Sequence, residues 1–467
     1  MQTNETVDLE LDAGQKKRLI ILICTILAFS VMNGTMFNVA IPDISDTFQL
    51  KPSEVSWVMT GYILIFSIGS LMYGKLADIY PIRTLLTIGI ALFSTGAFIG
   101  FLSPNYGTLV VARVLQAIGG ATIPALSFLI PARFLPKERG RVFGIVSSTV
   151  AFASGIGPIL GGVVTSLLNW RFLFLLSVAA SFAIPLFRKW LPQEEKREGK
   201  IDYIGAALLA IAVANLLFFI TTFLWYTAVT SAVFMGLFVW RTISVDEPFI
   251  QPEILKNIRY STTVFTSFLS IAVLFGLIFV IPIMLADLYG FTAFQIGLVL
   301  FPGAMTSAFI GQVGGKIIDE KGGVPVVKAA LMLIGTGTIL ISTFAGASAW
   351  VIATCLLISY LGFPLIQSST ADLLSSVLPD KQNGVGIGLF NLLNFLAGAL
   401  SSAILGKVLD SKSVEISLNP LSASGENVIY SNVFLILTTI AVIALTTFTI
   451  MFIKTERKHN QVQNNFS

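Results

Sequence analysis

The stretch Gly74–Asp78, GKLAD, returns 241 residues later as Gly315–Asp319, GKIID. Each copy ends a long apolar run and begins a short charged turn. A motif that repeats at the ends of apolar helices predicts two related helix bundles in a lipid bilayer. Secondary transporters are commonly built from two such repeats around a site near the middle of the membrane.

The composition predicts an all-α polytopic membrane protein. The chain has 467 residues, of which 55% are hydrophobic and only 12% are charged, and its mean hydropathy is +0.85. Soluble domains are roughly 25% charged. Long apolar runs recur along the chain, and a run of about 20 apolar residues spans a hydrocarbon core of about 30 Å. A membrane barrel would instead show alternating segments of about ten residues.

The apolar runs predict fourteen spans. They cover 19–41, 55–77, 82–102, 106–130, 141–165, 170–190, 202–222, 225–242, 262–286, 293–318, 324–345, 348–373, 384–409 and 431–453. The pair at 202–242 is tight, but a single segment of that length would be too long to cross the membrane once.

The spans are organised as six, two and six, which predicts two six-helix bundles with two extra helices between them in the sequence. We expect a six-helix bundle over 1–200, a two-helix insertion over 201–245 and a second six-helix bundle with a polar tail over 246–467. The stretch Arg188–Lys200 is strongly charged and predicts a linker after the first bundle.

The distribution of basic residues predicts the orientation. Of 29 Lys and Arg residues, 24 fall on the side that also holds both termini, and four fall on the other side (Lys51, Arg171, Lys407 and Lys412). Cytoplasmic loops carry such an excess, so we expect both termini in the cytoplasm and the protein in the plasma membrane. Anionic lipid accounts for the net charge of +4 without a nucleic acid.

Several classes of chemistry are excluded. Cys24 and Cys355 lie in spans, which disfavours a disulfide framework, and the one histidine, His459, lies in the polar tail. No metal site, cofactor site or nucleophile–base pair of an enzyme is visible. The stretch Gly69–Lys75 mimics the start of a phosphate-binding loop, but Leu76 occupies the place of the metal-binding hydroxyl. Transport therefore uses an ion gradient or none. We also expect the protein to be a monomer.

Six motifs carry a family resemblance: Asn38–Asp43 (NVAIPD), Trp57–Tyr62 (WVMTGY), Tyr73–Asp78 (YGKLAD), Arg113–Gln116 (RVLQ), Gly155–Gly162 (GIGPILGG) and Asp202–Gly205 (DYIG). Together they make the chain resemble the major facilitator superfamily, within it the fourteen-helix drug:proton antiporters, and most closely the tetracycline efflux proteins of Gram-positive bacteria. The resemblance extends over nearly the whole chain and implies export of small molecules coupled to protons.

The repeated turns are candidate parts of a conformational gate. Asp78 ends the second span, and its carboxylate can accept hydrogen bonds from the amino end of a nearby helix. Arg83 can pair with it across the turn. The resemblance implies that this motif holds the two halves together in the outward-facing state. The alternative is that the charges only solvate a helix end. The candidate residues are Gly74, Asp78, Arg83, Gly315 and Asp319.

The fifth span carries the signal for export. Its small residues recur on one helix face, which another backbone can approach closely, and Pro158 leaves the carbonyl of Ser154 without its helical partner. The resemblance implies an antiporter motif that packs against the opposite half. The alternative is an ordinary contact between helices. The residues concerned are Ser154, Gly155, Gly157, Pro158, Gly161 and Gly162.

Arg113 is the only basic residue that is well inside a predicted span. A charge at that depth is costly and by default indicates a functional site. We expect Gln116, one turn further on, and Asp43 as its partners. The resemblance implies that this arginine takes part in proton coupling. The alternative is a structural arginine that binds backbone carbonyls.

Carboxylates are missing where the resembling exporters have them. All 25 Asp and Glu residues fall in loops, tails or the ends of spans. The resemblance places a membrane glutamate at the position of Ser154 and another at Gly398. Without those carboxylates a metal–tetracycline complex loses its ligands, so tetracycline is disfavoured and proton carriage would depend on Asp43.

Uncharged polar residues remain for a substrate cavity in the centre of the membrane. Such amides can also simply hold helices together. Among many phenylalanines they suit a large amphipathic or lipophilic compound, and they predict an exporter of drugs or metabolites. The alternative is a facilitator-fold protein that does not pump, namely an importer, a uniporter or a membrane sensor. The amides are Asn33, Asn38, Asn215, Gln367, Asn391 and Asn394.

Overall fold

The computed structural model describes residues 12–50, 55, 57–197, 202–291, 293–379, 382–410, 416–422 and 428–464. The boundary expected at residues 200 and 201 lies outside this part of the chain, and so does the side chain of Asn38. The helices are α1 (Ala13–Phe48), α3 (Trp57–Ala77), α4 (Ile82–Phe101), α5 (Tyr106–Gly120), α6 (Thr122–Phe134), η1 (Pro136–Glu138), α7 (Arg139–Leu167), α8 (Phe172–Val178), η2 (Ala179–Phe182), α9 (Ala183–Trp190), α10 (Tyr203–Thr222), α11 (Trp225–Ser244), α12 (Pro252–Lys256), α13 (Ile258–Tyr289), α14 (Ala293–Lys321), α15 (Gly323–Phe344), α16 (Ala349–Val377), α17 (Asn383–Asp410) and α18 (Val428–Asn464).

Fourteen segments of the described chain are long and apolar enough to span a membrane, as the sequence predicts. The tight pair is two helices, because the chain reverses at Phe223, which takes a left-handed backbone conformation with φ of 55°. The first helix is longer than its apolar run. It continues through polar residues to Phe48 and ends where the N–H of Gln49 donates to the carbonyl of Ser45.

Two of the predicted spans are broken. The fourth span consists of α5 and α6, which meet at Ala121. Pro124 follows the break, and since proline lacks an N–H, the carbonyl of Gly120 loses its helical partner. In the sixth span a 3₁₀ turn, η2, separates α8 from α9 just before Pro185. Because periodicity and hydropathy are continuous through these segments, the sequence pattern alone did not separate them.

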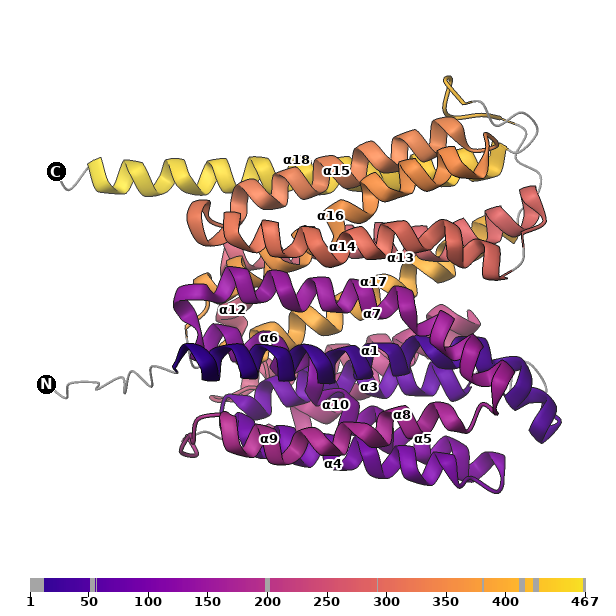
Figure 1. Cartoon of the computed structure of the whole chain (residues 1–467). Helices are drawn as coiled ribbons and strands as arrows, with labels where there is room; N and C mark the ends of the chain where they lie inside the picture. The colour runs from indigo at the N-terminus through magenta and orange to yellow at the C-terminus, as the bar shows by residue number, and fades with distance from the viewer. Residues whose placement is uncertain are drawn as a thin grey trace, which may run out of the picture.

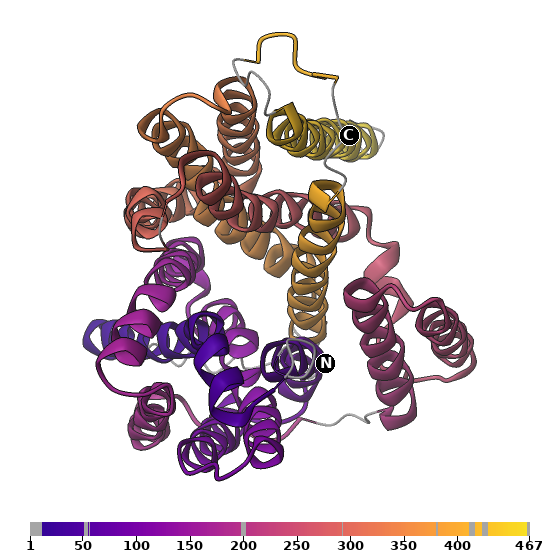
Figure 2. The same ribbon diagram turned by 90° about the vertical axis from the view of Figure 1, so that its right-hand side faces the viewer.

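The helices form two groups and a separate pair (Figures 1 and 2). The first bundle contains α1 and α3 to α9, and the second contains α13 to α18. Helices α10 and α11 lie beside the two bundles and not between them, as the view along the helices shows (Figure 2). Helix α1 begins and α18 ends on the same side of the molecule (Figure 1), which we call the terminal end.

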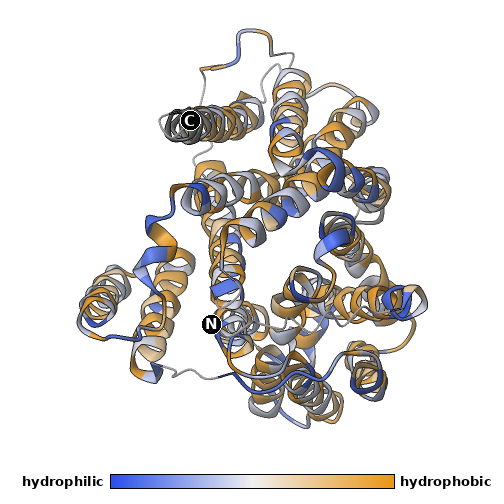
Figure 3. Cartoon of the chain, turned by 90° about the vertical axis from the view of Figure 1, so that its left-hand side faces the viewer, coloured by the Kyte–Doolittle hydropathy of each residue, from blue (hydrophilic) through white to orange (hydrophobic). Residues whose placement is uncertain are grey.

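Each bundle has its own apolar core. Ile23, Ile90 and Phe128 belong to the core of the first bundle, and Leu277 and Phe434 belong to that of the second. Hydrophobic residues occupy most of each helix, whereas hydrophilic residues gather in the turns at the terminal end (Figure 3). Exposed hydrophobic side chains face outward along the helices, as expected for surfaces in contact with lipid tails.

Candidate functional site

The first copy of the repeated motif connects the two bundles. Asp78 directly follows α3, and its carboxylate accepts hydrogen bonds from the backbone N–H groups of Gly384 (2.8 Å) and Val385 (3.0 Å), in the first turn of α17. The N–H groups at the start of a helix have no partner within the helix, and they favour a negative charge. We call this contact the first carboxylate cap.

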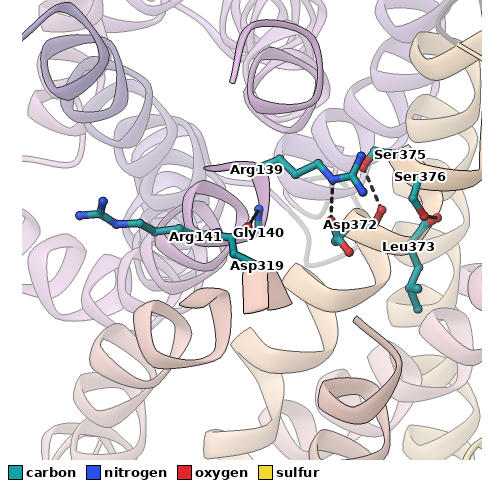
Figure 4. Close-up of polar contacts among 8 residues, drawn as sticks. All are labelled: Arg139, Gly140, Arg141, Asp319, Asp372, Leu373, Ser375 and Ser376. Carbon is teal, nitrogen blue, oxygen red and sulfur yellow. Dashed lines mark hydrogen bonds and ion pairs between the residues drawn. The ribbon is translucent and has the colours of Figure 1, made fainter. Parts of the chain in front are cut away.

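The second copy makes the matching contact, with its carboxylate on the second bundle and the helix it binds in the first. Asp319 near the end of α14 accepts from the N–H groups of Gly140 and Arg141, both at 2.9 Å, at the start of α7 (Figure 4). We call this contact the second carboxylate cap. Asp78 is buried, whereas Asp319 is exposed. The two caps are therefore equivalent in geometry but unequal in burial.

Glycines allow the helix pairs beneath the caps to touch. A Cβ atom on Gly74 would lie 2.9 Å from the Cα of Gly388, and one on Gly315 would lie 2.7 Å from the carbonyl oxygen of Gly140. A Cβ on Gly144 would fall on the carbonyl oxygen of Gly311. Since real Cβ atoms do not come this close, both crossings need glycine, and the bundles are in backbone contact at the terminal end.

The run Gly155–Gly162 packs differently from what its resemblance implied. Gly157 faces Thr35, and a Cβ on Gly161 would lie 2.7 Å from the carbonyl oxygen of Met36. Both partners belong to α1 of the same bundle, so the expected contact with the opposite half is wrong at these two glycines. Gly155, Pro158 and Gly162 are half-buried in α7, which continues through Pro158 to Leu167.

Arg83 does not form the expected pair with Asp78. Arg133, at the end of α6, is instead bound to the residue before Asp78. It donates to the carbonyl of Ala77 (2.9 Å) and pairs with Glu194 (3.0 Å). Glu194 also accepts from the N–H of Ile82 at 2.9 Å. The charged linker after α9 thus folds back over the turn that contains Asp78.

Burial raises the pKa of the Asp78 carboxyl from 3.8 to about 6. Its two backbone hydrogen bonds, and the positive charges of Lys75 and Arg133, act in the opposite direction but do not cancel the loss of water. Burial therefore moves the titration of Asp78 toward neutral pH.

Arg113 lies in a cage of uncharged groups. It donates to the carbonyl of Val58 (3.1 Å), to the side-chain oxygen of Asn33 (3.0 Å) and to that of Gln116 (2.7 Å). The guanidinium is stacked over two rings, 4.2 Å from the centre of Phe37 and 4.0 Å from that of Tyr62. Only 1% of Arg113 is exposed.

The expected pairing of Arg113 with Asp43 is wrong, although its pairing with Gln116 is confirmed. On α1 it is Asn33 that binds Arg113. Asp43 is ten residues further along the same helix. At 1.5 Å per residue this places Asp43 about 15 Å away along the axis, where it is exposed.

Only some of the predicted cavity residues remain candidates. The side chain of Asn33 is already hydrogen-bonded to Arg113 and to Ser177. Asn215 donates to its own helix, α10, which lies outside the bundles. The second bundle holds the other three amides. Asn394 accepts from Ser267 at 3.0 Å, while Asn391 Nδ2 and Gln367 Oε1 are buried without a hydrogen-bond partner among the described residues.

The two positions that lack a carboxylate differ in their surroundings. Ser154 is half-buried in α7. A Cβ on Gly398 would lie 2.9 Å from the ring of Phe275. The phenylalanine ring thus fills the space that a longer side chain at this position would need.

Sequence reasoning did not predict the charged contacts of Glu194 and Arg139. Glu194 reaches Arg133 across 61 residues, and Arg139 at the start of α7 pairs with Asp372 of α16 at 2.8 Å (Figure 4). Arg139 and Asp372 belong to different bundles. The only signal was the basic patch Arg133–Arg141, which charge counting attributes to membrane orientation.

Comparison with known proteins identifies the family. Residues 23–402 match the model of the Major Facilitator Superfamily. The chain is 26% identical to the riboflavin transporter RibZ of Clostridioides difficile, over 83% of this chain and 87% of that protein. It is 25% identical to the lincomycin resistance protein LmrB of Listeria innocua, over 85% and 87% respectively. The structure of the human organic anion transporter MFSD10 superposes with a TM-score of 0.67 at 16% identity, covering 91% of this chain and 99% of the other. The chain belongs to the Major Facilitator Superfamily and is a membrane transporter, not an enzyme.

Proposed function

We propose that this protein exports lipophilic or amphipathic drugs or metabolites from the cytoplasm by alternating access, driven by protons. The observation that carries the proposal is the pair of carboxylate caps, Asp78 on α17 and Asp319 on α7. Each joins one bundle to the other through hydrogen bonds that water can replace. Such contacts suit a gate that opens and closes at the terminal end, and the excess of Lys and Arg there supports a cytoplasmic position for it.

Export is supported by the resemblance of the Gly155–Gly162 run to antiporter motifs and by the similarity to a lincomycin resistance protein. The remaining candidates for substrate contact are Gln367, Asn391 and Asn394, since none of them is bound to a charge in the structure. They offer hydrogen bonds without a fixed charge, which suits a large, weakly charged compound.

Asp78 replaces Asp43 as the proposed proton carrier. Its pKa is about 6 with the terminal end closed, and contact with water would return the pKa toward its ordinary value. A proton held in the closed state would therefore be released into the cytoplasm when this end opens. Arg113 is proposed as a positioning residue that fixes α1 against α5, rather than as part of an ion pair.

A second function, transport without proton coupling, is favoured by one observation. Every described group that Arg113 contacts is uncharged, so no carboxylate of the described part of that cage can carry a proton. The similarity to a riboflavin transporter is compatible with this alternative.

Expression in a pump-deficient bacterium tests the proposal. Susceptibility to dyes, biocides and antibiotics is scored for the wild type and for Asp78→Asn, with and without a protonophore. We expect resistance to at least one compound that both the protonophore and Asp78→Asn abolish at equal protein levels. Resistance or accumulation that the protonophore leaves unchanged would favour transport without proton coupling.

A further inference from the structure

A basic pocket lies beside the second carboxylate cap, at the boundary between the bundles. It has a volume of about 530 Å³ and is lined by Arg139 from α7, by Lys321 and Lys328, and by Asp372 from α16. Figure 4 shows Arg139 reaching across to Asp372. Pockets of several hundred Å³ are large enough for a small ligand.

The pocket carries more positive charge than its own groups neutralise. Asp372 is the only carboxylate among the described residues that line the pocket, and it accepts from Nε of Arg139 at 2.8 Å. Among the described residues, the two terminal nitrogens of that guanidinium have no hydrogen-bond partner and neither lysine forms an ion pair. Two cationic charges and a free guanidinium edge therefore face the same space.

The backbone adds donors to the same space. Helix α15 begins at Gly323, and Gly322 before it, with φ of +80°, supplies no side-chain cap. Both glycines line the pocket. The uncapped amino end of a helix favours an anion, and planar guanidinium groups and lysines bind phosphate oxygens with charge-assisted hydrogen bonds.

We propose that this pocket binds a phosphate group, which Arg139 contacts from the first bundle and Lys321 and Lys328 contact from the second. The phosphate belongs either to the headgroup of an anionic lipid or to a soluble phosphate compound, since the pocket lies at the ends of membrane spans. Bound phosphate adds contacts between the bundles at the end where the carboxylate caps lie. The effect of the phosphate on gating rests on the proposed function, but the binding of phosphate does not.

Thermal unfolding of the purified full-length protein in detergent tests the binding. The pocket variant is Lys321→Gln/Lys328→Gln, and the matched control is Lys189→Gln/Lys256→Gln, whose lysines lie in α9 and α12 outside the pocket. One arm adds phosphatidylglycerol or, as a comparison, phosphatidylcholine. The other arm adds sodium phosphate or sodium chloride at equal ionic strength.

We expect wild type and control to gain roughly 4 °C in unfolding midpoint at saturating ligand, and the pocket variant to lose most of that gain. A gain with phosphatidylglycerol alone assigns the phosphate to lipid, and a gain with sodium phosphate assigns it to a soluble compound. Equal gains in the pocket variant and the control, or no gain in either arm, would overturn the proposal. Because nothing is transported in this assay, a failed transport assay leaves its result unaffected.

Discussion

The carboxylate of Asp78 accepts from the N–H of Gly384 at 2.8 Å, although 306 residues separate them in the chain. The hydrogen bond joins the end of one bundle's helix to the start of the other's. Asp319 and Gly140 repeat it at 2.9 Å in the reverse direction. The duplicated sequence motif is thus a duplicated contact between the bundles.

Gly144→Ala should abolish transport while the protein still inserts in the membrane. Its new Cβ would fall on the carbonyl oxygen of Gly311, so α7 and α14 could not approach as closely at the terminal end. Gly297→Ala is the matched control on α14, because a Cβ there meets nothing within 4 Å. Efflux of a transported dye, normalised to protein level, measures the effect. Normal efflux by Gly144→Ala would show that the close crossing is not required.

Lowering the pH should favour the closed terminal end. Since the pKa of Asp78 is raised from 3.8 to about 6 in the closed state, that state binds protons more tightly than one in which the carboxyl is in water. The stabilisation of the closed state by the protonated Asp78 carboxyl is present at low pH and is lost as the pH rises through about 6. Between pH 7.5 and 5.5 the ratio of closed to open molecules should rise roughly fourfold.

Spin labels at Thr84→Cys and Glu320→Cys, in a chain with Cys24→Ala and Cys355→Ala, report this ratio through their distance distribution. Asp78→Asn cannot titrate at this position, so its distribution should depend less on pH than that of the wild type. A terminal end that opens as the pH falls would mean that the loss of the charged hydrogen bonds outweighs the burial of the carboxylate.

Arg113→Lys should reduce transport by about 10-fold, equivalent to about 1.4 kcal/mol. Lysine keeps the charge but cannot contact Val58, Asn33 and Gln116 together or stack on the two rings. If Arg113 only positions α1 against α5, the lysine variant should also unfold at a lower temperature while keeping the wild-type pH profile. An altered pH profile at unchanged stability would instead assign Arg113 to proton coupling.

The protein should give no resistance to tetracycline. Neither Ser154 nor Gly398 supplies a carboxylate, and the ring of Phe275 fills the space at Gly398. Minimum inhibitory concentrations in a pump-deficient strain measure this directly. A raised value for tetracycline that Ser154→Ala leaves unchanged would contradict the carboxylate argument.

The number of spans, the family and the position of the repeated turns could be predicted from the sequence, because hydropathy and motif spacing are local properties. The partners of Asp78 could not, since Gly384 becomes its neighbour only when two bundles dock. Asp43 illustrates the same limit. Its motif made it a partner of Arg113, but the rise of α1 places Asn33 at that level instead.

The central claim is that the two carboxylate caps hold the terminal end closed. The distance distribution between labels at Thr84 and Glu320 tests it most directly in Asp78→Ala/Asp319→Ala, which leaves four helix N–H groups without an acceptor. We predict a new population at longer distance, larger for Asp78→Ala alone than for Asp319→Ala alone, because Asp78 is buried and Asp319 is exposed. A distribution in the double variant that matches the wild type would contradict the claim.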